Sequence, residues 1–208
     1  MLFIDVDAAC KLAHWNILPL LPELTGIPWS EMATVSSLKY RAQQAANKPD
    51  GKLFQSIEAA KTVVFAVEAM SPAGTPDPEM LALLSAIPQI DPGEAVLLAL
   101  LARDTANKLL TGDKRAIRAL AANAAAKHFE GRLICIEQIL DNALRLNGRD
   151  WFLANVCPNR SIDKAVSMIL GSRCDAQLEI LNAGIQSYVN ELIRLRDPSI
   201  LVASNRSQ

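Results

Sequence analysis

The chain has 208 residues, of which 50% are hydrophobic and 21% are charged, and its formal net charge is −1. This balance is typical of a folded globular protein with one large domain, or one domain and an appendage. A net charge so close to zero excludes a global attraction to nucleic acid or acidic lipid, so any such binding requires a local basic patch.

The sequence predicts no association with a membrane. The longest uninterrupted apolar run near Glu94 covers only residues 95–102, whereas a bilayer-spanning helix needs about 20 residues. The N-terminus, MLFIDVDAA, has no basic segment and reaches an acidic residue at Asp5, so no signal peptide is expected. We therefore expect a cytoplasmic protein.

The cysteines and histidines are too scattered to suggest a metal site. Cys10, Cys135, Cys157 and Cys174 include no pair at metal-ligand spacing, and the two histidines, His14 and His128, lie far apart. A zinc site is therefore not expected. In a cytoplasmic protein, these cysteines are predicted to be buried, reduced thiols.

Short apolar segments alternate with helical patterns along most of the chain. The first strand, Leu2–Ile4, ends at Asp5 and is followed at once by a helix over Ala8–Ile17, which is the order of an α/β unit. The other elements expected in this half are an irregular helix over 18–26, a weak strand over 33–36, and two helices, over 37–47 and 53–70, separated by the breaker KPDG.

A loop rich in Pro, Gly and Ser at 71–78 precedes the second half of the pattern. The segments KLLT and RLIC are predicted as two further buried strands, each followed by a helix. This alternation favours a parallel sheet covered on both faces. The elements expected here are strands over 108–111 and 132–135, and helices over 79–87, over 94–103, over 113–127 and from the last strand to Leu146.

The composition changes after residue 147. Residues 147–160 read as irregular, and no further strand is evident. Helices are expected over 162–170 and 175–195, the second of them amphipathic, and the tail after Pro198 is expected to fray. The predicted organisation is a domain over 1–147 with a helical C-terminal extension over 148–208.

Three acidic residues occupy junctions between elements. Asp5 ends the strand LFI and Asp113 follows the strand KLLT, and in parallel sheets functional groups gather at the carboxyl ends of strands. Glu94 opens an apolar helix. Asp7, two residues after Asp5, faces the same way if the chain stays extended there.

Each of these residues also has a purely structural explanation. Asp7 fits an N-cap for a helix that begins at Ala8, whereas Asp5 comes too early for that role. Asp91 and Glu94 match a capping box around Pro92. Asp113 needs no further role than that of an N-cap. Both explanations stay open, because a first-turn carboxylate can cap a helix and also reach outward.

A cluster of carboxylates is costly unless cations neutralise it. Ligand sets made only of oxygen suit Mg²⁺ or Mn²⁺. Such ions activate water and stabilise charge on a phosphate under attack. The cluster therefore points to phosphodiester hydrolysis.

Four segments together resemble the PIN-domain family of metal-dependent ribonucleases. They are LFIDVDAACKLA, GEAVLLALLA, LLTGDKRAIRALA and GRLICIEQIL, and the resemblance covers roughly residues 1–147. It implies a three-layer α/β/α sandwich with a mostly parallel sheet, and an enzyme that hydrolyses RNA with Mg²⁺ or Mn²⁺. By this resemblance Asp5, Glu94 and Asp113 are catalytic metal ligands, and Thr111 supports them by hydrogen bonding. It also implies a second copy of the chain or a protein inhibitor as partner.

The sequence departs from the family at one acidic position. PIN nucleases usually carry another acid on the helix after the second strand, where ATVSSLKYRAQQA has Lys39, Tyr40 and Arg41. A cation there binds phosphate or replaces the metal by a fixed charge. The alternative function is thus a degenerate module that binds nucleic acid or protein without cleaving it. Lys39, Arg41, Lys114 and Arg115 are the candidate nucleic-acid contacts, unless they only line solvated helix faces.

Overall fold

A four-stranded parallel sheet forms the centre of the chain. The computed structural model describes residues 1–203, and its strands are β1 (Leu2–Ile4), β2 (Met32–Ala33), β3 (Lys108–Thr111) and β4 (Leu133–Cys135). Their spatial order is β2-β1-β3-β4, and every pair is parallel. The predicted α/β class and parallel sheet are therefore confirmed.

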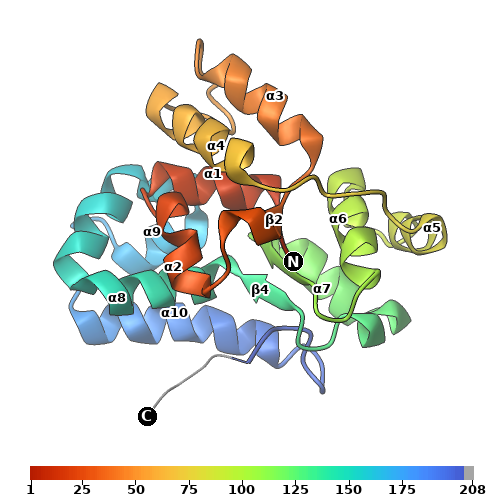
Figure 1. Ribbon diagram of the computed structural model, residues 1–208. Coiled ribbons are helices and arrows are strands. Elements are labelled where there is room, and N and C mark those ends of the chain that lie inside the picture. The colour runs from red at the N-terminus through yellow and green to blue at the C-terminus, as the bar shows by residue number, and fades with distance from the viewer. Residues whose placement is uncertain (204–208) are drawn as a thin grey trace.

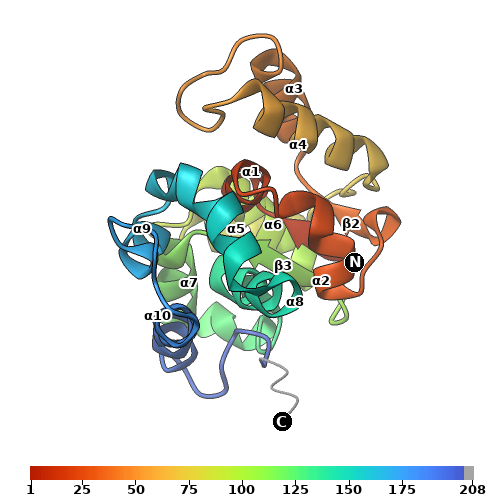
Figure 2. The same ribbon diagram turned by 90° about the vertical axis from the view of Figure 1, so that its left-hand side faces the viewer.

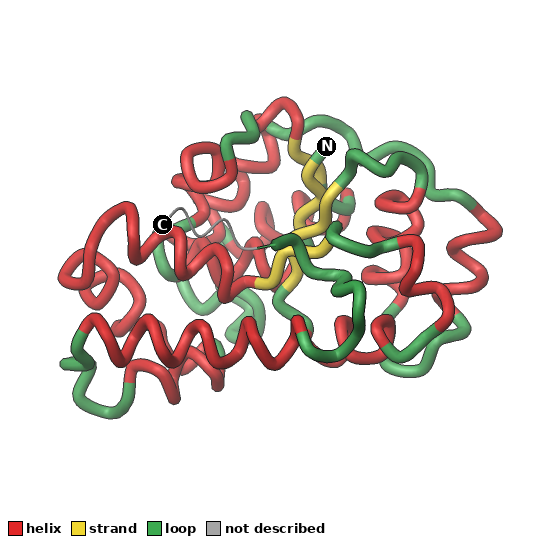
Figure 3. The backbone as a smooth tube through the Cα atoms, turned by 90° about the horizontal axis from the view of Figure 1, so that it is seen from below, coloured by secondary structure: helices red, strands yellow, loops and turns green. Residues whose placement is uncertain are grey.

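Helices cover the sheet on both of its faces (Figures 1 and 3). Along β1, Leu2 and Ile4 belong to one hydrophobic core and Phe3 to the other, because successive side chains of a strand point to opposite faces. The α-helices are α1 (Val6–His14), α2 (Leu21–Thr25), α3 (Ser36–Ala45), α4 (Ile57–Ala69), α5 (Pro78–Ser85), α6 (Pro92–Ala102), α7 (Lys114–Ala121), α8 (Ile136–Val156), α9 (Lys164–Leu170) and α10 (Leu178–Ile193).

The pairing of β1 with β3 fixes the edge at which the acidic residues meet. Ile4 lies opposite Leu110, and the amide of Asp5 donates a hydrogen bond to the carbonyl of Leu110 at 2.9 Å. The next residues of both chains, Asp5 and the Thr111–Asp113 turn, therefore leave the sheet at the same edge. This is the arrangement expected for parallel strands.

Several predicted boundaries are shifted by capping. Helix α1 begins at Val6 rather than Ala8, so Asp5, and not Asp7, occupies the N-cap position. Helix α4 begins only at Ile57, because Ser56 caps it by accepting a hydrogen bond from Ala59. The helix predicted over 113–127 is two elements, α7 and a 3₁₀ helix over 124–128, since Asn123 caps the second one.

The prediction that residues 147–160 are irregular is wrong. Helix α8 runs from Ile136 to Val156 and is kinked at Gly148, whose φ of 79° lies in the left-handed region. Glycine adopts this conformation without a steric cost, so the chain turns there and resumes its helix. The predicted boundary at 147/148 falls at this kink, and Phe152 and Val156 beyond it join the core that also contains Leu2.

The tail after Pro198 is ordered where the structure describes it. Ile200 and Leu201 are buried, and the amide of Leu133 in β4 donates a hydrogen bond to the carbonyl of Ile200. Leu201 also forms a parallel bridge with Leu133. The prediction that the tail frays is thus wrong for these residues. For residues 204–208 the same prediction lies outside the described residues.

The prediction of reduced thiols holds for two cysteines and fails for two. Cys10 and Cys135 are free and buried, as expected. Cys157 and Cys174 form a disulfide, with their Cα atoms 6.0 Å apart. The turn through α9 brings them together, and their sequence spacing does not reveal that turn. In the part of the chain described here, no helix combines the length and apolarity needed to cross a bilayer.

Lys11 joins the C-terminal helices to α1. Its ammonium lies 2.7 Å from the carboxylate of Asp7 and 2.8 Å from that of Asp163, the N-cap of α9. The Lys11 and Asp163 side chains are only 13% and 9% exposed. Removing one partner of a buried ion pair costs more than the pair contributes, because it leaves uncompensated buried charge.

We therefore expect Lys11→Ala to lower the free energy of unfolding by about 3 kcal/mol. Urea denaturation at pH 7 measures this, with Lys61→Ala as the control because Lys61 is exposed and makes no ion pair with any described residue. Equal denaturation midpoints for the two variants would contradict the structural role assigned to Lys11.

Candidate active site

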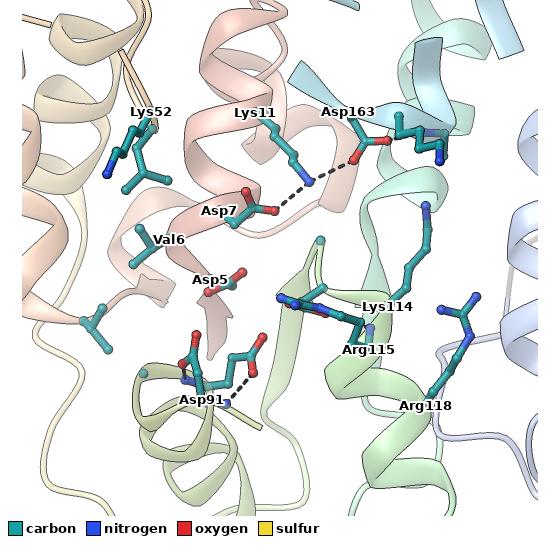
Figure 4. A pocket seen from close by; sticks show the side chains of 18 of the residues that line it. Asp5, Val6, Asp7, Lys11, Lys52, Asp91, Lys114, Arg115, Arg118 and Asp163 are labelled. Carbon is teal, nitrogen blue, oxygen red and sulfur yellow. Dashed lines mark hydrogen bonds and ion pairs between the residues drawn. The ribbon is translucent and has the colours of Figure 1, made fainter. Parts of the chain in front are cut away.

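The predicted acidic residues line one open cleft of about 1170 Å³. Asp5, Asp7, Glu94 and Asp113 all contribute to its wall, so the structure brings together residues that are far apart in the sequence. Figure 4 shows Asp5 at the end of its strand, with the side chains of α1, α7 and the C-terminal helices around it. Two further acids that the sequence analysis did not select, Asp91 and Asp163, also line the cleft.

Asp5 is the acid least explained by a structural role. Although it occupies the N-cap position of α1, its side chain makes no capping hydrogen bond. The residue is only 8% exposed. Burial raises the pKa of Asp5 to about 7, and Asp7, Asp91 and Asp113 add to the rise by repulsion, against a hydrogen bond from the Val6 amide. A buried carboxyl without a cation is the condition that a bound metal ion would relieve.

Glu94 forms the predicted capping box with Asp91. The Glu94 amide donates to Asp91 Oδ1 and the Asp91 amide donates to Glu94 Oε2, each at 2.8 Å. Burial raises the pKa of Glu94 to about 8, assisted by repulsion from Asp113, Asp91 and Asp5 and opposed by the hydrogen bond from Asp91. The predicted capping role of Glu94 is therefore confirmed, and its charge also interacts with the other acids of the cleft. Its role as a metal ligand stays a prediction.

Asp113 is the predicted N-cap of α7 and also carries a counter-ion. Its Oδ1 accepts hydrogen bonds from the amides of Arg115 and Ala116, and Arg115 Nη2 donates to Oδ2 at 2.7 Å. Burial acts to raise the pKa of Asp113, but the bonds from Arg115 and the two amides outweigh it and lower the pKa. Of the three predicted catalytic acids, Asp113 is thus the one whose pKa is lowered rather than raised.

Thr111 and Gly112 shape the turn that carries Asp113. The hydroxyl of Thr111 accepts a hydrogen bond from the Asp113 amide at 3.1 Å. A Cβ atom on Gly112 would lie 2.8 Å from Asp7 Oδ2, so any other residue here would displace the Asp7 carboxylate from its position beside Lys11. The support predicted for Thr111 is therefore seen as a bond to the backbone of Asp113.

Asp7 and Asp163 share the ammonium of Lys11, as the dashed lines in Figure 4 show. These two carboxylates hold the pKa of Lys11 above its usual value, although burial opposes them. Asp7, like Asp113, is therefore a predicted metal ligand that already has a cation beside it. Sequence analysis missed Asp163, whose only signal was its place as a cap before α9.

The four predicted nucleic-acid contacts have different surroundings. Lys114 forms an ion pair with the fully buried Glu137, and its ammonium lies 4.6 Å from the centre of the Tyr188 ring. Arg115 pairs with Asp113. Arg41 lines the cleft, whereas Lys39 lines a neighbouring groove. Among the described residues of the cleft, the cations that make no ion pair are Arg41, Lys52 and Lys164.

The carboxylate oxygens of the cleft are ligands that a hard divalent cation prefers, but they do not form a preassembled metal site. Within residues 1–203, no three His, Cys, Asp or Glu side chains form a group that could hold a metal ion. Asp5 and Glu94 nevertheless have raised pKa values that a cation would lower again. The donor set therefore fits Mg²⁺ or Mn²⁺ by the type of its ligand atoms. To bind such an ion, Asp113 would have to give up its ion pair with Arg115.

Comparison with known proteins adds no family assignment. No protein-family model matches the chain, and no significant match is found among curated proteins or among solved structures. The resemblance to PIN domains therefore stays a prediction.

The raised pKa of Asp5 predicts how stability depends on pH in the absence of divalent cations. Its pKa is about 7 in the folded chain and about 4 when unfolded, so the folded state binds the proton more tightly. Folding is therefore penalised as pH rises from about 4 to about 7. The penalty approaches about 4 kcal/mol above that window.

Asp5→Asn has no such penalty, because its amide does not titrate. We expect the variant to gain stability relative to the wild type between pH 4 and pH 8, by up to about 4 kcal/mol. Urea unfolding in metal-free buffer at both pH values measures this gain. Asp175→Asn, at an exposed position, serves as the control, and a stability difference that is the same at both pH values would refute the assigned pKa.

Proposed function

We propose that the chain is a PIN-like ribonuclease that hydrolyses phosphodiester bonds of RNA in this cleft with Mg²⁺ or Mn²⁺. The observation that carries the proposal is the convergence of Asp5, Glu94 and Asp113. They come from three separate segments, line one cleft and influence one another's ionisation. Perturbed carboxyls in a cleft are a mark of functional sites. The parallel sheet between two layers of helices is compatible with the family's three-layer sandwich.

In this proposal Asp5, Glu94 and Asp113 hold the divalent cation. When bound, such an ion supplies an activated water and stabilises the charge that develops on the phosphate. The chain's own contribution is to fix the carboxylates on two strand ends and one helix start. The raised pKa values of Asp5 and Glu94 oppose metal binding near neutral pH, because these two carboxyls must release protons to bind a cation.

The cations on the rim are suited to the RNA backbone. Arg41, Lys52 and Lys164 line the cleft and make no ion pair with any described residue. Charges that are free to contact phosphate contribute affinity that falls with salt. These cations therefore supply a local attraction to phosphate that the net charge of −1 does not provide.

A second candidate function is a module that binds nucleic acid without cleaving it. Two observations favour it: Arg115 already neutralises Asp113, and Arg41 stands in the cleft wall on the helix where the family carries an acid. A fixed guanidinium substitutes for part of the metal's charge but does not activate water. The two functions differ in whether RNA is cut when Mn²⁺ is added.

For the nuclease, Asp5→Asn and Asp113→Asn should each reduce cleavage roughly a hundredfold or more, because each removes a ligand worth several kcal/mol of transition-state stabilisation. Asparagine retains the capping ability of Asp113, so circular dichroism should remain unchanged. Cleavage of labelled single-stranded RNA with Mn²⁺, with and without chelator, is the assay. Asp175→Asn is the control. Full activity in both site variants would exclude this mechanism.

Arg115 should compete with the divalent cation for Asp113. We expect Arg115→Gln to bind Mn²⁺ more tightly than the wild type, since the carboxylate no longer has a counter-ion to displace. Isothermal titration with Mn²⁺ measures the affinity without any need for turnover. Arg194→Gln is the matched control, because Arg194 is exposed and lies outside the cleft. Equal affinities in the two variants would remove Arg115 from this role.

A further inference from the structure

An apolar groove of about 810 Å³ lies beside the acidic cleft. Its lining includes Val96 and Leu100 of α6, and Val67 and Met70 at the end of α4. Lys39 and Tyr40 of α3 line it as well. Figure 2 shows α3 and α4 side by side above the rest of the chain, which agrees with their extensive contact.

The groove and the cleft are adjacent. Val35, Ser37, Pro92 and Gly93 line both of them, so the two cavities border each other at the starts of α3 and α6. A ligand in the cleft therefore has the groove as its immediate neighbour.

Helix α3 presents different chemistry to the two cavities. Arg41 lines the cleft, whereas Lys39 and Tyr40 line the groove. Tyr40 is 66% exposed, so its ring is accessible to a ligand in the groove. An accessible aromatic ring with cations in the same groove and in the adjacent cleft suits a nucleic-acid strand, in which flat bases alternate with charged phosphates.

We propose that this groove binds a base of single-stranded RNA, stacked on Tyr40, next to the phosphate held in the cleft. The inference rests on the proposed function, and it deepens it by naming the form of the substrate. A base in an RNA duplex is stacked and paired, so it cannot enter the groove while its phosphate lies in the cleft. Stacking is tolerant of sequence, because every base offers a flat face.

Charge favours RNA over a protein segment as the occupant. Lys39 lines the groove together with Tyr40, and Arg41 lines the adjacent cleft, so each cavity offers a cation to the phosphates that neighbour the stacked base. Neither cation makes an ion pair with a described residue. An apolar peptide would use the groove but would leave these charges without a role.

The test is binding of a fluorescein-labelled oligouridylate of about twelve nucleotides, followed by fluorescence anisotropy in EDTA so that no cleavage occurs. We expect Tyr40→Ala to weaken binding about tenfold, since stacking contributes roughly this factor or more per base. Tyr40→Phe keeps the ring and should bind like the wild type. Phe65→Ala is the matched control, because Phe65 is 69% exposed and lines neither cavity.

An RNA of the same length with abasic positions supplies the decisive comparison. It should bind more weakly than oligouridylate to the wild type, and Tyr40→Ala should change its affinity little. A duplex RNA should also be insensitive to Tyr40→Ala. Two results would overturn the base-binding assignment. The first is that Tyr40→Ala binds oligouridylate like the wild type, which is the result expected if the groove binds protein. The second is that Tyr40→Ala weakens the binding of abasic RNA as much as that of oligouridylate.

Failure of this inference differs from failure of the proposed nuclease. If Mn²⁺-dependent cleavage depends on Asp5 and Asp113 but Tyr40→Ala binds normally, only the groove assignment falls. If no cleavage occurs and yet binding depends on the Tyr40 ring, the groove assignment stands for a non-catalytic module. A wild-type protein that binds no single-stranded RNA overturns the groove assignment.

Discussion

The parallel pairing of β1 with β3 is the constraint on which the rest of the structure depends. It brings the end of the first strand beside a turn more than a hundred residues later, and the bond between the Asp5 amide and the Leu110 carbonyl secures that register. A shift of one residue would turn every side chain of β1 to the opposite face. Both hydrophobic cores and the position of Asp5 would then be lost together.

Charge at the cleft is balanced by neighbouring residues rather than by the chain as a whole. Lys11 pairs with both Asp7 and Asp163, Arg115 pairs with Asp113, and Lys114 pairs with Glu137. Asp5 and Glu94 make no ion pair with a described residue, and burial together with repulsion from neighbouring acids raises their pKa values. Two of the three carboxylates for which a divalent cation is proposed therefore lack a counter-ion.

The C-terminal helices belong to the cleft as well as to the fold. Asp163, Lys164 and Tyr188 line it, and the core residues of α9 and α10 merge with those of the sheet. The segment expected to be an appendage therefore completes one wall of the candidate site. Lys11 of the first helix adds an ion pair with Asp163 to this packing.

Sequence alone determined the elements whose cause is local. Strand β3 and the capping box of Asp91 and Glu94 were predictable, because apolar runs and capping groups act over a few residues. The convergence of Asp5 and Asp113 was predicted from the rule for parallel sheets, and Glu94 was added to them by the resemblance to PIN domains. Tertiary structure alone decided the disulfide, the kinked continuation of α8, and the partners of Lys11 and Lys114. These depend on contacts between distant segments, whose geometry no local pattern encodes.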